Sequence, residues 1–537
     1  MSSDQAIGNQ IGYLSQITPY TNGKPMKPQT YVNEIGYFGN QDPEHGSKGR
    51  RMSRPTPDEP CTKIVATIGP ACSSVDQLAN LIQHGVAVFR INSAHGSRAS
   101  HQETLDNVRK ASLQVGFPVG VLYDLAGPKI RLGTLACDPY HCETGSQVTL
   151  IRGEESSVDS ELTSNYDKLL DELQVGDSVM LADGNVSLQV ASVTADRVVC
   201  DVLAGGTIRS RQGINLPGVK LSISAMRRQD VDNAIWAAQE GVDFISLSFV
   251  RTAGDVESLK NLISTYESKA MVIAKIEKRE AMEDLEAIVE AADGVMVARG
   301  DLGVEIDVAE TPVAQKRIIR VCRDKLKPVI VATQMLESMH HSPRPTRAEA
   351  SDVANAILDG ADACMLSGET AIGEYSVEAV DMMFRIQQHT ERELVGPSKS
   401  LIKTIDRAHP ITSAVAYGAT QIADSIQAKM LIVVTRTGGT AWVKSKQRSL
   451  IPTLGVSDNE DTLRRMSLFW GIKPLRVSQL DDTEKLFSEV SGWGCRGGHL
   501  SAGDRLVFVT GTGVMDSAHN LVVVHKVTSE EAKAAQK

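Results

Sequence analysis

The sequence alternates short apolar runs, each typical of a β-strand, with longer segments that have helical periodicity. Eight such runs are rich in Val, Ile and Ala and show little polar alternation: residues 63–69, 86–92, 119–125, 243–249, 271–277, 294–300, 328–334 and 363–369. Runs of this kind are typical of strands that are buried on both faces of a parallel sheet. Eight β-α units in series predict a (β/α)8 barrel. An open doubly wound sheet is the alternative, but the even spacing favours closure.

One interval in this series is far too long for a barrel loop. Residues 131–220 contain β-type segments with polar alternation, and Asp183-Gly184 is a hairpin signal between two of them. We therefore predict a small β-barrel domain inserted after the third strand. Because barrel active sites lie at the carboxyl ends of the strands, this inserted domain is expected to act as a lid.

The remaining segments define the other predicted parts of the chain. Residues 58–130 and 221–395 make up the predicted catalytic barrel, and residues 396–537 form a separate C-terminal α/β domain. Residues 1–57 are rich in Gly, Pro, Asn and Gln without a helical or strand period, so we interpret them as a disordered extension. We expect the charged tail at 528–537 to fray.

Composition and charge argue against several classes of function. A net charge of −10 argues against a nucleic-acid surface, and no apolar run is long enough to span a bilayer. The segment from Cys137 through His141 to Cys142 fits no standard zinc site, so we expect the eight cysteines to be free thiols in a reducing compartment. We expect a cytoplasmic protein.

Charged and polar residues gather where the predicted barrel strands end. They are Arg90, Asn92 and His95 after the second run; Asp124, Lys129 and Arg131 after the third; Lys275 and Glu277 in the fifth; Asp301 after the sixth; Thr333 in the seventh; and Ser367 and Glu369 in the eighth. Carboxyl ends of parallel barrel strands share one mouth, so these side chains are expected to converge.

The residue types at this mouth suit phosphoryl transfer. Glu277 and Asp301 are a sensible carboxylate pair for Mg²⁺ or Mn²⁺, which prefer oxygen ligands. Lys275, Arg90 and Arg131 supply positive charge for phosphoryl oxygens, and this chemistry depends mainly on positioning and on neutralising charge. The structural alternative is that these residues form salt bridges at the barrel rim.

Nine motifs in this order resemble those of the pyruvate kinase family. They are TKIVATIGP, FRINSAHG, DLAGPKIR, INLPG, AKIEK, MVARGDLGVE, VATQMLESM, PRPTRAEASDVANAILDGAD and MLSGETA. The resemblance runs from about Thr62 through the barrel and the inserted domain, and more weakly through the C-terminal domain. It implies transfer of a phosphoryl group from phosphoenolpyruvate to ADP, giving pyruvate and ATP, which is the last step of glycolysis.

The resemblance also implies roles for individual residues. Glu277 and Asp301 would bind Mg²⁺, and Lys275 would stabilise the transferring phosphoryl group and the enolate. Arg90 would hold the phosphate. The Gly300 and Asp301 amides, with Thr333, would bind the substrate carboxylate. Thr333 would also relay a proton to the enolate carbon. The nucleotide phosphates would be contacted by Asn92, His95 and Arg131.

The sequence departs from the family at a monovalent-cation site. Many members need K⁺, held by an Asn, a Ser, an Asp and a Thr carbonyl. Asn92 and Asp124 remain here, but the Ser position is Ala94 and the Thr position is Leu125. The Glu that K⁺-dependent members carry in this turn is Lys129, whose tethered ammonium could supply the charge of the free ion. We therefore predict K⁺ independence. The alternative is a surface lysine paired with a neighbouring acid.

Two further regions resemble family features. A Lys that usually precedes the lid's return motif is Gln212 here, and Arg209 or Arg211 could replace its nucleotide contact. The loop of Thr435, Arg436, Thr437, Gly438, Gly439 and Thr440 lies between a predicted strand and helix and resembles the loop that binds phosphorylated effectors. A plain Gly-rich turn is the alternative. The family also implies a homotetramer.

Two other functional classes could use some of the same residues. A Mg²⁺-dependent lyase or aldolase acting on enolpyruvate could use Glu277 and Asp301, but it would need neither Arg131 nor a lid nor a nucleotide. A catalytically silent regulatory protein would be suggested by loss of Lys275 or of a metal carboxylate, and all of these are present.

Overall fold

The computed structural model describes residues 59–394, 410–511 and 520–535, which belong to one compact unit. The predicted extension at 1–57 and the predicted domain boundary at 396 lie outside the described residues. No helix within these ranges is both long and apolar enough to cross a bilayer.

The eight apolar runs form a closed parallel barrel, which confirms the predicted fold class. Its strands are β1 (Lys63–Thr67), β2 (Val86–Asn92), β3 (Gly120–Leu125), β12 (Phe244–Leu247), β13 (Met271–Ile276), β14 (Gly294–Ala298), β15 (Val329–Ala332) and β16 (Ala363–Leu366). They pair in the order β1-β16-β15-β14-β13-β12-β3-β2. Almost every residue of these strands is buried, as the absence of polar alternation predicted.

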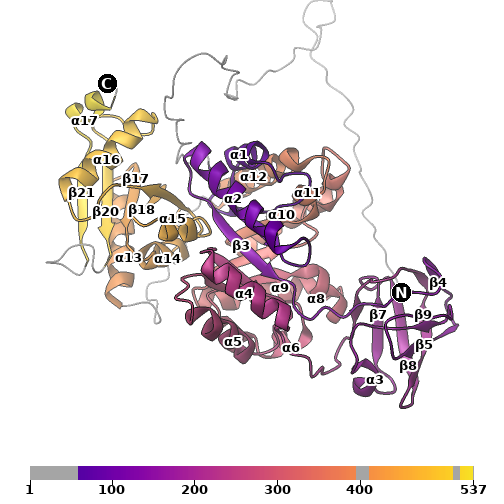
Figure 1. The fold of residues 1–537 in the computed structure, drawn as a ribbon. Helices are drawn as coiled ribbons and strands as arrows, with labels where there is room; N and C mark the ends of the chain where they lie inside the picture. The colour runs from indigo at the N-terminus through magenta and orange to yellow at the C-terminus, as the bar shows by residue number, and fades with distance from the viewer. Residues whose placement is uncertain (1–58, 395–409, 512–519, 536–537) are drawn as a thin grey trace, which may run out of the picture. The chain divides into compact units, whose positions relative to one another are not determined.

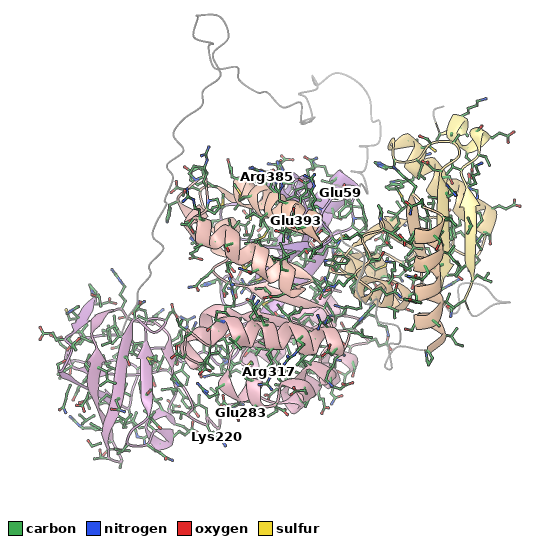
Figure 2. All side chains as sticks on the ribbon, turned by 180° about the vertical axis from the view of Figure 1, so that it is seen from behind. Glu59, Lys220, Glu283, Arg317, Arg385 and Glu393 are labelled. Atoms are coloured by element: carbon green, nitrogen blue, oxygen red, sulfur yellow. The ribbon has the colours of Figure 1, made fainter. Side chains whose placement is uncertain are left out.

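Helices surround the barrel (Figure 1). They are α1 (Val75–Gln83), α2 (Arg98–Val115), α4 (Arg228–Gln239), α5 (Ala253–Ser264), α6 (Arg279–Glu283), α7 (Leu285–Ala291), α8 (Arg299–Glu305), α9 (Thr311–Asp324), α10 (Arg347–Asp359), α11 (Gly368–Ala371) and α12 (Ser376–Glu393), with the 3₁₀ turn η1 (Glu337–His340). Their apolar faces pack on the strands, while charged side chains such as Arg317 of α9 and Arg385 of α12 are more than 40% exposed on the outside (Figure 2).

The insertion after β3 is all-β apart from one short helix, α3 (Leu169–Glu172). A six-stranded sheet has the order β11-β7-β8-β9-β5-β6, and a two-stranded sheet pairs β10 with β4. These strands are β4 (Tyr140–Cys142), β5 (Gln147–Ile151), β6 (Glu161–Leu162), β7 (Ser178–Leu181), β8 (Val186–Val193), β9 (Arg197–Ala204), β10 (Gly206–Ile208) and β11 (Ile214–Asn215). Asp183 and Gly184 turn β7 into β8 with positive φ angles of 54° and 87°, as the hairpin signal predicted.

The C-terminal region is a separate α/β arrangement with a five-stranded sheet of order β19-β18-β17-β20-β21. Its elements are α13 (Pro410–Ser425), β17 (Met430–Val434), α14 (Gly439–Lys446), β18 (Thr453–Ser457), α15 (Glu460–Met466), β19 (Ile472–Arg476), α16 (Thr483–Arg496), β20 (Arg505–Thr510), β21 (Val522–Lys526) and α17 (Ser529–Ala534). The expectation of a frayed tail is wrong for α17, because Thr528 and Glu531 form a capping box that satisfies its first amides.

The C-terminal region contacts the amino-terminal end of the barrel through a buried ion cluster. The Lys446 ammonium lies 2.8 Å from both carboxylate oxygens of Asp362, and the Arg448 guanidinium lies 3.1 Å from one of them. Lys446 and Asp362 are 3% and 1% exposed. Asp362 immediately precedes β16 and also accepts the Val329 amide of β15. The cluster therefore joins α14 to the start of two barrel strands.

Candidate active site

A network of buried charges lies at the carboxyl ends of β2, β3 and β13. Lys275 Nζ lies 3.0 Å from Glu277 Oε1 and 3.3 Å from Asp124 Oδ2. The Arg90 guanidinium donates to the same Asp124 oxygen through Nε at 2.8 Å and Nη2 at 2.6 Å. Since Lys275 and Glu277 are two residues apart, they share a face of the strand, as their spacing predicted.

Asp124 is surrounded by donors. Ser246 Oγ donates to its second oxygen at 2.6 Å, so both carboxylate oxygens are occupied. Burial by itself would raise the pKa of Asp124, but Lys275 and Arg90 outweigh burial and hold that pKa below its usual range. The pKa of Lys275 is raised for the converse reason, because Asp124 and Glu277 outweigh its burial. Both groups therefore remain charged at neutral pH.

The two carboxylates predicted to bind a metal have different surroundings. Glu277 is 1% exposed and accepts the Phe249 amide at 2.8 Å, and its pKa is raised by burial and by the Asp301 carboxylate, against the opposing effect of Lys275. Asp301 lies in the first turn of α8 and is about one-quarter exposed. A buried carboxylate beside a second carboxylate favours a divalent cation between them, so these residues fit Mg²⁺ or Mn²⁺.

Lys129 reaches this site from the turn after β3. Its ammonium lies 3.2 Å from Asp301 Oδ1, and its side chain is about 29% exposed. Lys129 Cε also lies 3.0 Å from the position that a Cβ would take on Gly213, in the segment that returns from the insertion. The acid beside Lys129 is therefore the candidate metal ligand.

Thr333 occupies a left-handed backbone conformation at the end of β15, with φ of 68°, and Gln334 follows at 54°. This conformation is strained for a β-branched residue and is concentrated at functional sites. Thr333 Oγ1 accepts the Gly300 amide at 2.8 Å and donates to the Ala332 carbonyl. Arg299 Nη2 donates to the Thr333 carbonyl at 2.7 Å, while Nη1 donates to Asp352 at 2.6 Å. Arg299 therefore holds the strained turn.

The residues predicted to face the nucleotide lie nearer the surface. Asn92 Oδ1 accepts the Ala94 amide at 3.1 Å, and the His95 side chain is exposed. Arg131 donates to the Arg211 carbonyl at 3.1 Å. Gln212 Oε1 accepts the Arg209 amide at 2.7 Å within the same turn. The last two contacts lie at the start and end of the insertion, whereas Asn92 ends β2 and His95 lies in the loop after it.

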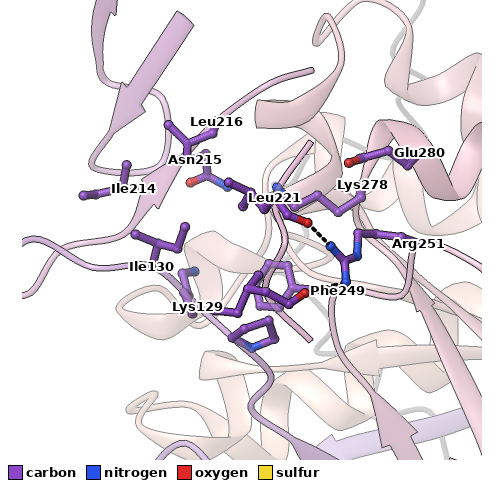
Figure 3. A pocket seen from close by; sticks show the side chains of 12 residues that line it. Lys129, Ile130, Ile214, Asn215, Leu216, Leu221, Phe249, Arg251, Lys278 and Glu280 are labelled. Atoms are coloured by element: carbon purple, nitrogen blue, oxygen red, sulfur yellow. Dashed lines mark hydrogen bonds between the residues drawn. The ribbon is translucent and has the colours of Figure 1, made fainter. Parts of the chain in front are cut away.

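A small cavity lies next to Lys129, where the insertion meets the barrel (Figure 3). Its apolar lining comes from both parts, including Ile214 and Leu216 of the insertion and Phe249 of the barrel. Arg251 fastens this junction, because its guanidinium donates to the carbonyls of Leu221 at 2.7 Å and Ile223 at 2.6 Å. The junction between the insertion and the barrel thus lies beside Lys129.

The predicted effector loop caps α14. Gly438 adopts a positive φ of 91° as the N-cap residue, and its amide donates to Thr435 Oγ1 at 3.0 Å. Thr462 Oγ1 donates to the Arg436 carbonyl at 2.8 Å, and the Arg436 side chain pairs with Asp481. Thr440 is buried, whereas Thr437 and Gly439 are exposed.

Two residues that contact the charged network were not predicted from the sequence. Ser248 Oγ accepts from Lys275 Nζ at 2.7 Å, and Ser246 donates to Asp124. Both are hydroxyls at alternate positions in an otherwise apolar run, and that signal could have found them. Glu369, by contrast, does not reach the charged network through any contact in the described chain, because its carboxylate accepts the amides of Leu336 at 3.0 Å and Ser367 at 2.7 Å.

Comparison with known proteins supplies independent evidence. The profile of the pyruvate kinase barrel domain matches residues 59–380, and the profile of the pyruvate kinase alpha/beta domain matches residues 413–525. The chain is 43% identical to pyruvate kinase 2 of Synechocystis over 84% of this chain and 76% of that protein. It is 39% identical to the pyruvate kinase of Mycobacterium intracellulare over 87% and 99%. A crystal structure of a pyruvate kinase from Cryptosporidium parvum superposes with a TM-score of 0.80 at 34% identity, covering 87% of this chain and 96% of the other.

Proposed function

This chain belongs to the pyruvate kinase family of phosphotransferases, and on that premise we propose that it transfers the phosphoryl group of phosphoenolpyruvate to ADP without requiring K⁺. The observation that carries the K⁺ proposal is the Lys129 ammonium 3.2 Å from Asp301 Oδ1. The nucleotide requirement separates this activity from that of a Mg²⁺-dependent lyase.

Glu277 and Asp301 would hold Mg²⁺ or Mn²⁺, which neutralises phosphoryl charge and orients the oxygens of the substrates when bound. Lys275 and Arg90 would bind the transferring phosphoryl group, since both are positioned by ion pairs with Asp124. The Gly300 and Asp301 amides, with Thr333, would bind the substrate carboxylate. Thr333 would also pass a proton to the enolate carbon. Asn92, His95 and Arg131 would contact the nucleotide phosphates.

The contacts of Asp124 favour the absence of a bound monovalent cation. Its two oxygens already accept from Ser246, Arg90 and Lys275, while Asn92 Oδ1 accepts a backbone amide. With Ala94 in place of the Ser, one hydroxyl ligand for K⁺ is lost, and the Leu125 carbonyl already accepts from Ser248 Oγ at 2.7 Å. Lys129 is a covalently attached cation in the same region, so its positive charge needs no binding equilibrium.

The test is formation of ATP from phosphoenolpyruvate, ADP and Mg²⁺ in buffer free of K⁺ and Na⁺, and then with K⁺ added. We expect full activity without K⁺. We expect Lys129→Met to lose activity by roughly 100- to 1,000-fold, as removal of one positioned electrostatic group typically does. Lys316→Met is the matched control, because Lys316 lies on the exposed face of α9 and pairs with Asp359 there.

Each outcome bears on a different part of the proposal. Activity that appears only with K⁺ keeps the reaction and overturns the role of Lys129. Turnover of phosphoenolpyruvate without ADP would favour the lyase class. If no turnover occurs in either buffer, adding phosphorylated metabolites separates an effector-dependent enzyme from a silent protein.

The proposal also covers the roles of the inserted and C-terminal domains and the assembly of the protein. The insertion at 131–220 would act as a lid, and the C-terminal domain at 396–537 would be regulatory, with an allosteric phosphorylated effector at the loop from Thr435 to Thr440. Support for an anion at that loop comes from the exposed Gly439 at the N-terminus of α14. We further propose that the protein is a cytoplasmic homotetramer.

A further inference from the structure

Two loops at the carboxyl end of the barrel bring three metal-ligating side chains together. Glu337 and His340 lie on η1, after β15, and Glu369 lies on α11, after β16. One ligand atom from each residue lies within 4.8 Å of the other two. Because a 3₁₀ helix has three residues per turn, Glu337 and His340 project from the same side of η1. Within the described ranges this is the one His, Cys, Asp and Glu cluster with such spacing.

His340 offers an unused ligand atom. Its Nε2 is buried and has no hydrogen-bond partner, and Glu337 Oε1 lies 3.9 Å away, beyond hydrogen-bond distance. The ring packs against Gly368 through its Cε1–Nε2 edge, because a Cβ added there would come within 2.2–2.4 Å of these two atoms. The Ser367 hydroxyl beside it is also buried without a partner. Orphaned buried polar atoms are costly, so these atoms point to a missing ligand.

The Glu369 carboxylate is fully buried and held in place, and it could bind a metal ion through oxygen. The Leu336 and Ser367 amides each bind one of its oxygens, and each oxygen keeps a second lone pair. Glu337 is about 55% exposed, which gives an ion a path to the buried pair. A cation at this position would relieve the repulsion of the two carboxylates.

We propose that Glu337, His340 and Glu369 form a binding site for a first-row transition-metal dication such as Zn²⁺, separate from the catalytic Mg²⁺ carboxylates. One imidazole nitrogen with two carboxylates favours Zn²⁺, Co²⁺ or Ni²⁺ over Mg²⁺ or Ca²⁺, which prefer oxygen ligands alone. Three protein ligands leave one tetrahedral position for water. The ion would tie the loop that follows Thr333 to the loop that follows β16.

This inference goes beyond the proposed reaction, and its test is a binding measurement that needs no turnover. The full chain is freed of metal, saturated with Mg²⁺ to fill the catalytic site, and titrated with Co²⁺ while d–d absorption is recorded. We expect one Co²⁺ per chain with a tetrahedral spectrum and no thiolate charge-transfer band. Zn²⁺ should displace it.

Variants locate the ion. His340→Gln should weaken Co²⁺ binding by roughly tenfold or more, since loss of even an outer-shell partner costs that much. His341→Gln is the matched control, because His341 is 81% exposed and pairs with Glu374. Glu337→Gln is a second ligand variant whose exposed side chain leaves folding unaffected. No binding by the parent chain, unchanged binding in His340→Gln, or equal loss in His341→Gln would each overturn the proposal.

Discussion

Individual side chains in this protein are positioned by partners that lie far away in the sequence. Lys275 and Asp124 are 151 residues apart, yet each keeps the other ionised inside the barrel mouth. Arg299 shows the same principle for backbone geometry, because its guanidinium donates to the carbonyls of Thr333 and Gln334, both in left-handed conformations. The chemistry of the site therefore depends on residues that do not themselves react.

Replacing Arg299 by lysine should lower kcat by about 10- to 100-fold, because a small misplacement of a positioned group has an effect of that size. An ammonium cannot reproduce the planar fork that binds Asp352 and the Thr333 carbonyl together. Steady-state kinetics measures the effect, and KM for ADP should change little. Arg317→Lys, on the exposed face of α9, is the control. Equal kcat values in the two variants would contradict the positioning role.

Lys444 of α14 gives a pH-dependent stability. It is 2% exposed, and burial lowers the pKa of its ammonium from 10.5 to about 8. The unfolded chain binds the proton more tightly than the folded chain, so the buried ammonium lowers the free energy of unfolding. This destabilisation is fully present below pH 8 and disappears as the pH approaches 10.5. At roughly 1.4 kcal/mol per pKa unit, the destabilisation at pH 7 is about 3 kcal/mol.

Lys444→Met should therefore unfold at a higher temperature than the parent chain at pH 7, and this difference should shrink between pH 8 and 10. Thermal unfolding followed by circular dichroism across this range checks the prediction. Lys526→Met is the control, because Lys526 is exposed on β21. A stabilisation that does not depend on pH would show that packing, and not the charge, is responsible.

The position of the inserted domain depends on the two chain segments that join it to the barrel, because its sheet has its own buried core. Arg251 secures one of these segments at the Leu221 and Ile223 carbonyls, beside the cavity that Lys129 lines (Figure 3). Arg251 and Lys129 therefore lie at the same junction between the insertion and the barrel.

Arg251→Lys should raise KM for ADP several-fold with a smaller effect on KM for phosphoenolpyruvate. A lysine can bind one of the two carbonyls strongly but not both, so the lid should close less completely over the nucleotide. Kinetics with each substrate varied in turn gives the comparison. Arg228→Lys, at the exposed start of α4, is the matched control. Equal changes in both KM values would argue against a lid hinge at Arg251.

At the scale of the whole molecule, buried ion pairs join the C-terminal region to the barrel. Lys446, at the end of the helix that begins at the Gly438 loop, binds both oxygens of Asp362. Asp362 in turn accepts the amide that starts β15, whose far end carries Thr333. An apolar cluster that includes Leu122 and Phe244 of the barrel and Leu431 and Phe469 of the C-terminal region surrounds this junction.

Asp362→Asn should destabilise this junction by about 3–5 kcal/mol, because it leaves a buried ammonium without its full counter-charge. We expect a lower unfolding temperature and two separate calorimetric transitions in place of one. Asp324→Asn, on the exposed end of α9, serves as the control. A single transition at the parent temperature would show that the apolar contacts alone hold the two parts together.

The sequence by itself determined the elements of this protein. Runs of Val, Ile and Ala without polar alternation are stable only when both faces are buried, so all eight barrel strands could be located. The two-residue spacing of Lys275 and Glu277 also placed both on one face, where they form an ion pair. Such local patterns need no knowledge of the remaining chain.

Only the tertiary structure decided which polar groups meet. Ser248 reaches Lys275, Arg299 reaches the Thr333 carbonyl, and His340 reaches the region of Glu369 through strand register and loop return. These contacts join segments 27 to 34 residues apart, and the Lys446–Asp362 pair joins segments 84 residues apart. A sequence pattern has a period of two or 3.6 residues, so it cannot specify contacts that depend on how a closed barrel brings its strand ends together.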